Sequence, residues 1–422
     1  CIRDSYGFSP DQRVVNFILK DNFSSREIEV EYGQPFDGGY ATQEAQATYL
    51  RIDGPSRLNL NLEWNNSSLL TEADRGVIQT PGSASGLASD PDPASFRSLV
   101  ADGAGLEATL NWTTRLGQSG NALSLNATFE RDDSLRLQGL DAVVLTDPDG
   151  NAVQRSFNAA TPLTVDRRTD TYALGSTLNL GLGDWQVTGT LDASRNESAT
   201  ATRRRADTAA LVSAAASGAL ALDAALDGLV ADAGFDTADT RTDAAAVLLT
   251  ARGNPLYLPA GEVSLTLDTG FDWTRIESRD SRNPGLPIEL VRGDLTAGFN
   301  LGVPLTSRRD DVLAAIGDIT LNLAGGVDHL SDFGTLYDWS AGLTWGLTDT
   351  LTLNVTYLNR DAAPGLSQLG SPEVATPNVP IFDLSTGETV LATVISGGNP
   401  LLPAQNQSDW KIGLIWELPL LD

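Results

Sequence analysis

Apolar and polar residues alternate strictly along many short stretches of the chain. This is the period of a β-strand with one wet face and one apolar face, because successive side chains of a strand point to opposite sides. The clearest stretch is 57–65, in which every second residue is apolar: Leu58, Leu60, Leu62 and Trp64. Residues 106–115, 295–305 and 351–357 repeat the pattern. The chain is therefore predicted to be all-β.

The same alternation predicts about 14 strands of roughly 8–14 residues, near the length that a tilted strand needs to cross a membrane. No apolar run reaches the roughly 20 residues that a membrane-spanning helix requires. The Ala-rich stretch 207–231 is interrupted by Asp223 and Asp227 and predicts a short loop helix instead. The predicted strands lie at 26–32, 43–52, 57–65, 106–115, 122–130, 171–181, 185–194, 240–251, 262–276, 293–305, 318–328, 336–346, 351–359 and 408–417.

The predicted connections alternate between short and long. The short ones are 53–56, 116–121, 182–184 and 347–350. The long ones are 66–105, 131–170, 195–239 and 360–407. Three connections fit less well, because two are long for a turn and one is short for a loop: 252–261, 306–317 and 331–335. Outer-membrane barrels have short periplasmic turns and long extracellular loops. We therefore expect an antiparallel transmembrane β-barrel in the outer membrane of a Gram-negative bacterium.

All eight tryptophans are predicted to lie on strands, on the face that carries the aliphatic side chains. Aromatic residues form girdles at both borders of the apolar band of such barrels, whereas a soluble core would place them at mid-strand. Two pairs are separated by six residues, Trp339/Trp345 and Trp410/Trp416, which is about 20 Å along a strand. We expect an outer belt of Trp64, Trp273, Trp339 and Trp410. We expect an inner, periplasmic belt of Trp112, Trp185, Trp345 and Trp416.

The opposite face of the predicted strands is polar and acidic. Burying its carboxylates against apolar groups would cost several kcal/mol each, so they must line water or another polar body. The carboxylates on this face are Glu27, Glu29, Glu31, Glu63, Glu107, Glu130, Asp268 and Asp272. A large polar lumen is therefore predicted inside the barrel.

Composition excludes several classes of protein. The 422 residues include 28 Lys and Arg against 55 Asp and Glu, a net charge of −27, which argues against a nucleic-acid partner. A single cysteine, Cys1, excludes an internal disulfide. Lipidation of Cys1 is one interpretation. Because the chain contains no methionine, the alternative is that Cys1 marks a processed end or the edge of a fragment.

Catalytic and metal-binding patterns are scarce. The single histidine, His329, stands beside Asp328 and near Ser331, but no nucleophile motif accompanies it, so a histidine at the rim of the barrel is favoured over a catalytic one. The acidic clusters 90–92 and 147–151 could ligate Ca²⁺, although Pro-Asp and Asp-Gly pairs form turns first. No enzyme activity and no cofactor are expected.

A basic run, Arg203–Arg205, lies in a predicted long loop. Arginine can bind the phosphates of lipopolysaccharide at the membrane surface. A solvated loop face is the favoured interpretation of this run.

Three segments resemble TonB-dependent outer-membrane transporters. Tyr6–Lys20, with its Val15-Asn16-Phe17-Ile18 core, is similar to the last strand of the family's plug domain. Residues 255–263 are similar to a periplasmic connection, and Gly398-Asn399-Pro400 with Pro403 is similar to a loop that precedes a strand. Here Ala404-Gln405 replace the acidic residue that usually follows that proline.

The resemblance implies a barrel of about 22 strands around a plugged lumen. Residues 1–24 would be the last plug strand and its junction, and residues 25–422 an incomplete barrel. The implied function is uptake of a scarce solute with energy from TonB, and the implied partners are TonB, a small solute, and outer-membrane lipid and lipopolysaccharide. A passive porin or a complete 14-stranded structural barrel is the alternative, and an outer-membrane hydrolase that uses His329 is a third possibility.

Overall fold

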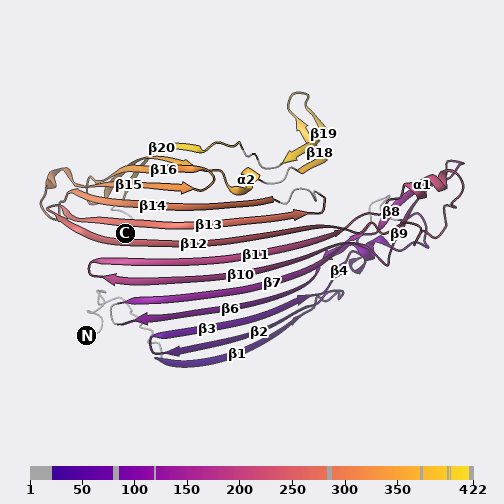
Figure 1. Ribbon diagram of the computed structural model, residues 1–422, viewed down its shortest axis with the longest axis horizontal. Coiled ribbons are helices and arrows are strands. Elements are labelled where there is room, and N and C mark those ends of the chain that lie inside the picture. The colour runs from indigo at the N-terminus through magenta and orange to yellow at the C-terminus, as the bar shows by residue number, and fades with distance from the viewer. Residues whose placement is uncertain are drawn as a thin grey trace.

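Fourteen strands form one continuous antiparallel sheet within the described residues (Figure 1). The computed structural model describes residues 21–78, 85–117, 120–282, 288–370, 374–396, 399 and 401–417. The strands of the sheet are β1 (Asn22–Gly33), β2 (Thr42–Asp53), β3 (Ser56–Ser67), β6 (Asp102–Leu116), β7 (Asn121–Gly139), β10 (Leu163–Leu182), β11 (Trp185–Arg203), β12 (Phe235–Leu258), β13 (Gly261–Asp280), β14 (Ile288–Thr306), β15 (Asp318–Leu330), β16 (Gly334–Gly346), β17 (Leu351–Ala362) and β20 (Gln405–Trp416). Each overlaps one predicted strand in the predicted order, so the predicted all-β antiparallel fold is confirmed.

Strands β1 and β20 are the two edges of this sheet. Within the described residues, β1 pairs with β2 alone and β20 pairs with β17 alone. Figure 1 shows a curved wall of strands that runs from β1 (indigo) to β20 (yellow). No pairing between β1 and β20 closes the described wall on itself. The plug strand expected at Tyr6–Lys20 lies outside the described residues.

Most short and long connections gather at opposite ends of the wall, as predicted, and the exceptions are the connection 307–317 among the short turns and the connection 331–333 among the long ones. At the short-turn end, Gly54 and Gly183 complete tight turns with φ of +54° and +62°, a conformation that glycine adopts without steric cost. At the other end, the long connections project away from the wall with β8, β9 and α1 (Figure 1). We call this the long-loop end.

The predicted connection 252–261 is wrong. Strand β12 continues to Leu258 and β13 begins at Gly261, so the turn consists of Pro259 and Ala260. The pairing of the two strands shifts between Gly253 and Leu256. Pro255 lies in this gap and has no N–H to donate to a ladder, which explains the bulge.

Several strands also extend further toward the long-loop end than predicted. Strand β7 runs to Gly139 rather than to residue 130, and β10 begins at Leu163 rather than at residue 171. Their backbone pairing continues there, although the apolar alternation has stopped. Charged residues replace the apolar ones in these extensions, so the alternation alone predicts a loop there.

The long connections contain small elements of their own. The short helix predicted within 207–231 is present as α1 (Ala209–Ala216). None of the described helices is long and apolar enough to cross a membrane. The elements that were not predicted are β4 (Leu70–Thr71), η2 (Ala73–Arg75), η3 (Pro93–Phe96), β5 (Ser98–Val100), β8 (Asp141–Thr146), β9 (Ala152–Phe157), η4 (Ala314–Ile316), α2 (Leu366–Gly370), β18 (Val374–Asp383) and β19 (Glu388–Ser396).

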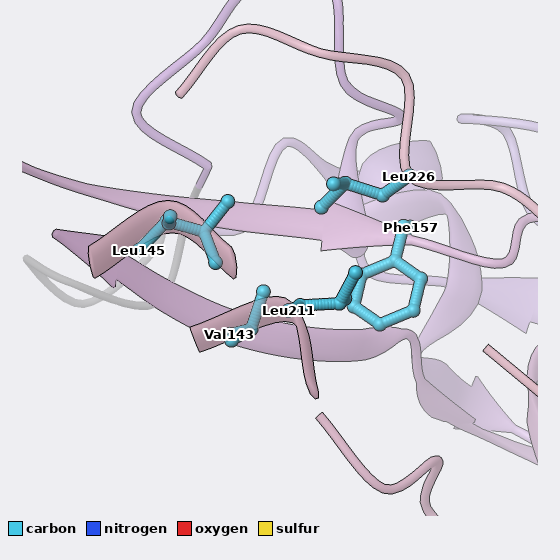
Figure 2. Close-up of a cluster of buried hydrophobic side chains, with 6 residues drawn as sticks. Val143, Leu145, Phe157, Leu211 and Leu226 are labelled. Carbon is cyan, nitrogen blue, oxygen red and sulfur yellow. The ribbon is translucent and has the colours of Figure 1, made fainter. Parts of the chain in front are cut away.

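Buried apolar side chains cluster in the long connections rather than on the wall (Figure 2). This loop core consists of Val143, Leu145, Phe157, Leu211, Ala215 and Leu226. None of the aliphatic residues expected to face outward from the wall is buried, and Leu62 is 49% exposed. The apolar alternation of the predicted strands assigns Leu58, Leu60, Leu62, Leu321, Leu323, Leu343, Leu353 and Val355 to this outward set. The apolar face of the wall therefore has no protein core packed against it in the described structure.

One close contact on the apolar face can be tested. Gly253 lies opposite Trp185, and a Cβ at Gly253 would come within 2.7 Å of the indole ring. We expect Gly253→Ala to destabilise the folded protein by about 1–3 kcal/mol, because the ring has to move. The matched control is Gly189→Ala on the same face, where a Cβ would meet Leu249 at 4.0 Å. Urea unfolding of the full-length protein measures both, and equal effects would contradict the packing argument.

Candidate functional site

The polar face of the wall carries a row of three opposed glutamates. Glu63 on β3 lies directly opposite Glu107 on β6, and Glu107 lies opposite Glu130 on β7. All three are half-buried. Like charges at directly opposed positions destabilise a sheet. The glutamate row therefore does not stabilise the sheet, and its side chains are available for another role on the polar face.

A second acidic group lies further along the same face, on β13 to β16. Asp272 and Asp294 are directly opposed, and Oδ1 of Asp294 is buried without a hydrogen-bond partner among the described residues. The members of this aspartate cluster are Asp268, Asp272, Asp294, Asp328 and Asp338.

Two glycines make room for the aspartate cluster. Gly298 and Gly326 are paired neighbours that lie between Asp268 and Asp338 in the register. A Cβ at Gly298 would come within 2.8 Å of a carboxylate oxygen of Asp268. The carboxylates of Asp268 and Asp338 therefore lie over the backbone of these two glycines, where a side chain would otherwise be.

Few cations balance these carboxylates. Arg292 lies on the same face, but its guanidinium is held by Asp332 at 2.7 Å and donates to the carbonyl of Pro364. Arg360 lies opposite Asp338. A surface with this excess of negative charge attracts cations and repels anions. Within the described residues, no group of three or more His, Cys, Asp or Glu side chains is arranged to hold a metal ion.

A buried ion pair organises the long-loop end. Arg155 of β9 binds Asp90 through two parallel hydrogen bonds of 2.7 and 2.8 Å, and the side chains are 3% and 6% exposed. The other terminal nitrogen of Arg155 donates to the carbonyls of Leu222 and Ala224. One guanidinium thus joins three long connections that are far apart in sequence.

The environment of Asp90 shifts its titration. Burial of the Asp90 carboxyl raises its pKa, but hydrogen bonds from Arg155, Ser85 and the N–H of Ser156 outweigh burial and lower the pKa overall. A carboxyl with a lowered pKa stabilises the fold above its unfolded-state pKa of about 3.9 and loses this contribution as pH falls through the folded value. We therefore expect the loop core to be intact at neutral pH and to loosen below about pH 4.

In the acidic clusters considered for Ca²⁺, Asp90 is bound to Arg155, whereas Asp92 and Asp147 organise local structure. Asp147 accepts hydrogen bonds from the backbone and side chain of Asn151, and Gly150 takes a φ of +85°. Asp92 caps η3 by accepting from the N–H of Ala94. These carboxylates are occupied by the chain itself.

His329 does not form a triad with its sequence neighbours. Its Nδ1 lies 2.8 Å from the hydroxyl of Thr335, and the Ser331 hydroxyl accepts from the N–H of Gly293. Asp328 and His329 are consecutive residues of β15, so their side chains point to opposite faces of the sheet. The expectation that His329 has no catalytic role stays a prediction, and the observed contacts favour it.

Two members of the basic run Arg203–Arg205 are engaged within the chain. Arg203 binds Asp232 at 2.8 Å and stacks over Phe235, and Arg204 binds Asp236 at 2.6 Å. Arg203 is the last residue of β11 rather than part of the loop, and these contacts favour the interpretation of the run as a solvated face at the long-loop end.

All eight tryptophans lie on strands of the wall. They are Trp64 on β3, Trp112 on β6, Trp185 on β11, Trp273 on β13, Trp339 and Trp345 on β16, and Trp410 and Trp416 on β20. None is buried, and Trp410 is 69% exposed. Tyr357 joins Trp339 and Trp410 in a chain of rings with centroids 5.2 and 5.0 Å apart, which sequence reasoning missed. The two belts remain a prediction.

Two structures similar to this chain are of the ferric enterobactin receptor PfeA from Pseudomonas aeruginosa. One is a mutant receptor, with a TM-score of 0.51, 13% identity, and coverage of 94% of this chain and 51% of the receptor. The other is a mutant in complex with enterobactin, with a TM-score of 0.50, 13% identity and the same coverage. No protein-family description and no curated protein matches the chain.

At this identity the likeness concerns the fold. The wall has the fold of an outer-membrane receptor barrel, and the predicted resemblance to TonB-dependent receptors is confirmed at that level. The chain spans about half the length of the receptors that it matches.

The ion pair between Arg155 and Asp90 gives a direct test of the loop core. We expect Arg155→Met to destabilise the loop core by about 3–5 kcal/mol, because it leaves a buried carboxylate without its partner. The double variant with Asp90→Asn removes that charge as well and should recover most of the loss. Hydrogen exchange over residues 141–157, corrected for intrinsic rates, measures the effect. Exchange in β15 and β16 should not change, and a double variant as unstable as the single one would refute this account.

Proposed function

We propose that this chain is the greater part of the barrel of an outer-membrane transporter that takes up a scarce solute. The solute would pass through a plugged lumen with energy delivered by TonB. Residues 1–24 would be the last plug strand and its junction, and residues 25–422 the barrel wall, which further strands would close between β20 and β1.

The observation that carries this proposal is a two-faced wall with the fold of a receptor barrel. Its apolar face has no packed core, and its polar face holds the glutamate row and the aspartate cluster. A sheet with these faces is stable when hydrocarbon lies on one side and water on the other. The fold likeness to outer-membrane receptors supports the same arrangement.

The charge of the polar face limits the solute. Glu107 and Asp294 belong to acidic groups with few nearby cations, so an anionic solute would be repelled along this part of the wall. We propose that the solute is neutral or cationic. The similar receptor structure contains enterobactin, but at 13% identity this does not identify the solute of this chain.

The membrane orientation can be tested on one strand. Leu343 and Thr344 are consecutive residues of β16 between Trp339 and Trp345, on the apolar and polar faces respectively. We expect Leu343→Arg to cost about 2–4 kcal/mol in lipid vesicles, because it places a charge in hydrocarbon. Thr344→Arg is the matched control and should cost little. Unfolding free energies in vesicles give the comparison, and equal costs would argue against a lipid-facing wall.

Energised uptake separates this proposal from a passive porin. Cells that lack the gene are compared with cells that express the full-length protein, and loss of solutes from a defined medium is profiled by mass spectrometry. We expect at least one neutral or cationic solute to be depleted by expressing cells alone, and a protonophore to reduce its depletion to the level of the deletion strain. Depletion that persists with the protonophore would support the porin instead.

A further inference from the structure

Charged side chains replace apolar ones on the outward face of the wall at its long-loop border. On β7, Arg131 follows Phe129 on the same face, and on β13, Arg275 follows Trp273. Neighbouring strands carry charges at matching positions, since Asp243 lies opposite both Arg195 and Arg275. We call this set the charge ladder: Arg131, Asp133, Arg168, Asp170, Arg195, Glu197, Arg241, Asp243, Arg275, Glu277 and Glu289.

Three arginines of the ladder bind a carboxylate through Nε. Nε of Arg195 and Nε of Arg241 bind the two oxygens of Asp243 at 2.6 and 2.8 Å. Nε of Arg168 binds Asp133 at 2.6 Å. Within the described residues, the terminal nitrogens of these three guanidiniums make no hydrogen bond.

Arg275 adds another unused donor to the ladder. One terminal nitrogen of Arg275 binds Glu277 and Glu289. Its Nε is buried without a hydrogen-bond partner among the described residues.

The arginines border two shallow depressions in the outer wall. One has a volume of about 740 Å³ and is lined by Tyr172, Arg195, Arg241, Asp243, Trp273 and Arg275, among others. The next has a volume of about 410 Å³, and Arg168 and Arg241 contribute to its lining. Each depression therefore combines guanidiniums with surface that faces away from the lumen.

We propose that the charge ladder binds the phosphorylated headgroup of the glycolipid in the outer leaflet, lipid A. A guanidinium fixed through Nε presents its two terminal nitrogens as a fork, and such forks match the geometry of phosphate oxygens. The ladder begins where the aromatic residues of the apolar band end, which is the level of lipid headgroups. The inference rests on the proposed membrane orientation but not on transport.

The carboxylates of the ladder balance the charge of its arginines, and this determines how the ladder can bind a phosphate. The ladder contains five arginines and six carboxylates, so it has little net charge. Long-range attraction therefore contributes little, and bidentate hydrogen bonds to individual phosphates carry the binding. Because direct contacts are screened less than distant ones, binding should persist at physiological salt, where the Debye length is about 8 Å.

The site is confined to one sector of the wall. Strands β15 to β20 carry Tyr337, Trp339, Tyr357 and Trp410 at the corresponding border of the outward face, with no arginine among them. Bound lipid should therefore depend on β7 to β13 alone.

The test measures lipid A that co-purifies with the full-length protein in mild detergent at physiological salt. The variant Arg168→Gln/Arg195→Gln/Arg241→Gln removes the free forks, and we expect bound lipid A to fall at least tenfold, because the charge-assisted hydrogen bonds to phosphate are lost. The matched control, Arg203→Gln/Arg204→Gln/Arg205→Gln, makes the same charge change beyond the ladder, at the end of β11 and after it, where Arg203 and Arg204 are already bound to Asp232 and Asp236, and it should retain lipid. Retention by the first variant, or equal loss from both, overturns the proposal.

Replacement of the three arginines by lysine guards against misfolding, because Gln would leave Asp243 unpaired. The Lys variant keeps the charge that balances Asp243 but lacks the fork, so it should also lose most of the lipid. Unchanged binding by a folded Lys variant, judged by heat-resistant migration on gels, would overturn the role of the forks.

The source of the phosphate is tested on delipidated wild-type protein. Added lipid A with both phosphates should rebind and raise the thermal unfolding temperature, whereas dephosphorylated lipid A and inorganic phosphate should not. Equal effects of phosphorylated and dephosphorylated lipid, or an effect of inorganic phosphate alone, would contradict a headgroup site. Since none of these measurements involves uptake, a failure here is distinguishable from a failure of the transport proposal.

Discussion

Backbone pairing between neighbouring strands is the constraint on which the rest of this structure depends. Each interior strand of the wall pairs along its length with two neighbours, and the side-chain period of two then divides its residues between two faces. A slip of one residue would move the carboxylates of the glutamate row to the apolar face and Leu62 to the polar one. The two faces are so different that a shift by an odd number of residues is excluded for each strand, and the separation of a polar face from an apolar face follows from this constraint.

The wall was predictable from the sequence because its signal is local. Leu58 to Trp64 alternate with polar residues whatever the partner strand is, and the same holds for the other strands. The prediction failed where the outward face stops being apolar. Beyond Phe129 the next outward residues are Arg131 and Asp133, so the predicted strand ends at residue 130, although the pairing of β7 with β10 continues to Gly139. At Pro255 the sequence predicts a connection because proline is a turn-forming residue. The structure instead places Pro255 in a bulge within the continuing strand β12.

The loop core and the ion pair of Asp90 with Arg155 could not be predicted, for a different reason. Their members come from three connections, and no sequence period links Phe157 to Leu211 or Asp90 to Arg155. Of the candidate residues, the acidic lumen face was anticipated as a pattern, but the opposition of Asp272 to Asp294 required the register. The charge ladder was missed because β7, β10, β11, β12 and β13 each contribute only one arginine and one carboxylate to it, and their alignment across strands required the register.

The contacts of Arg155 have a mechanical consequence. A guanidinium that is bound to Asp90, Leu222 and Ala224 couples connections that could otherwise fluctuate separately. Moving any one of the three connections away breaks its buried contacts with Arg155 and exposes the groups that the other two connections bind. The long-loop end therefore opens as one cooperative unit rather than one connection at a time. A solute or an antibody that engages one connection would thus change the mobility of the other two. A sequence change in any one of these connections must preserve its contacts with the other two. The sequence of this part of the surface should therefore change more slowly during evolution than that of independent loops.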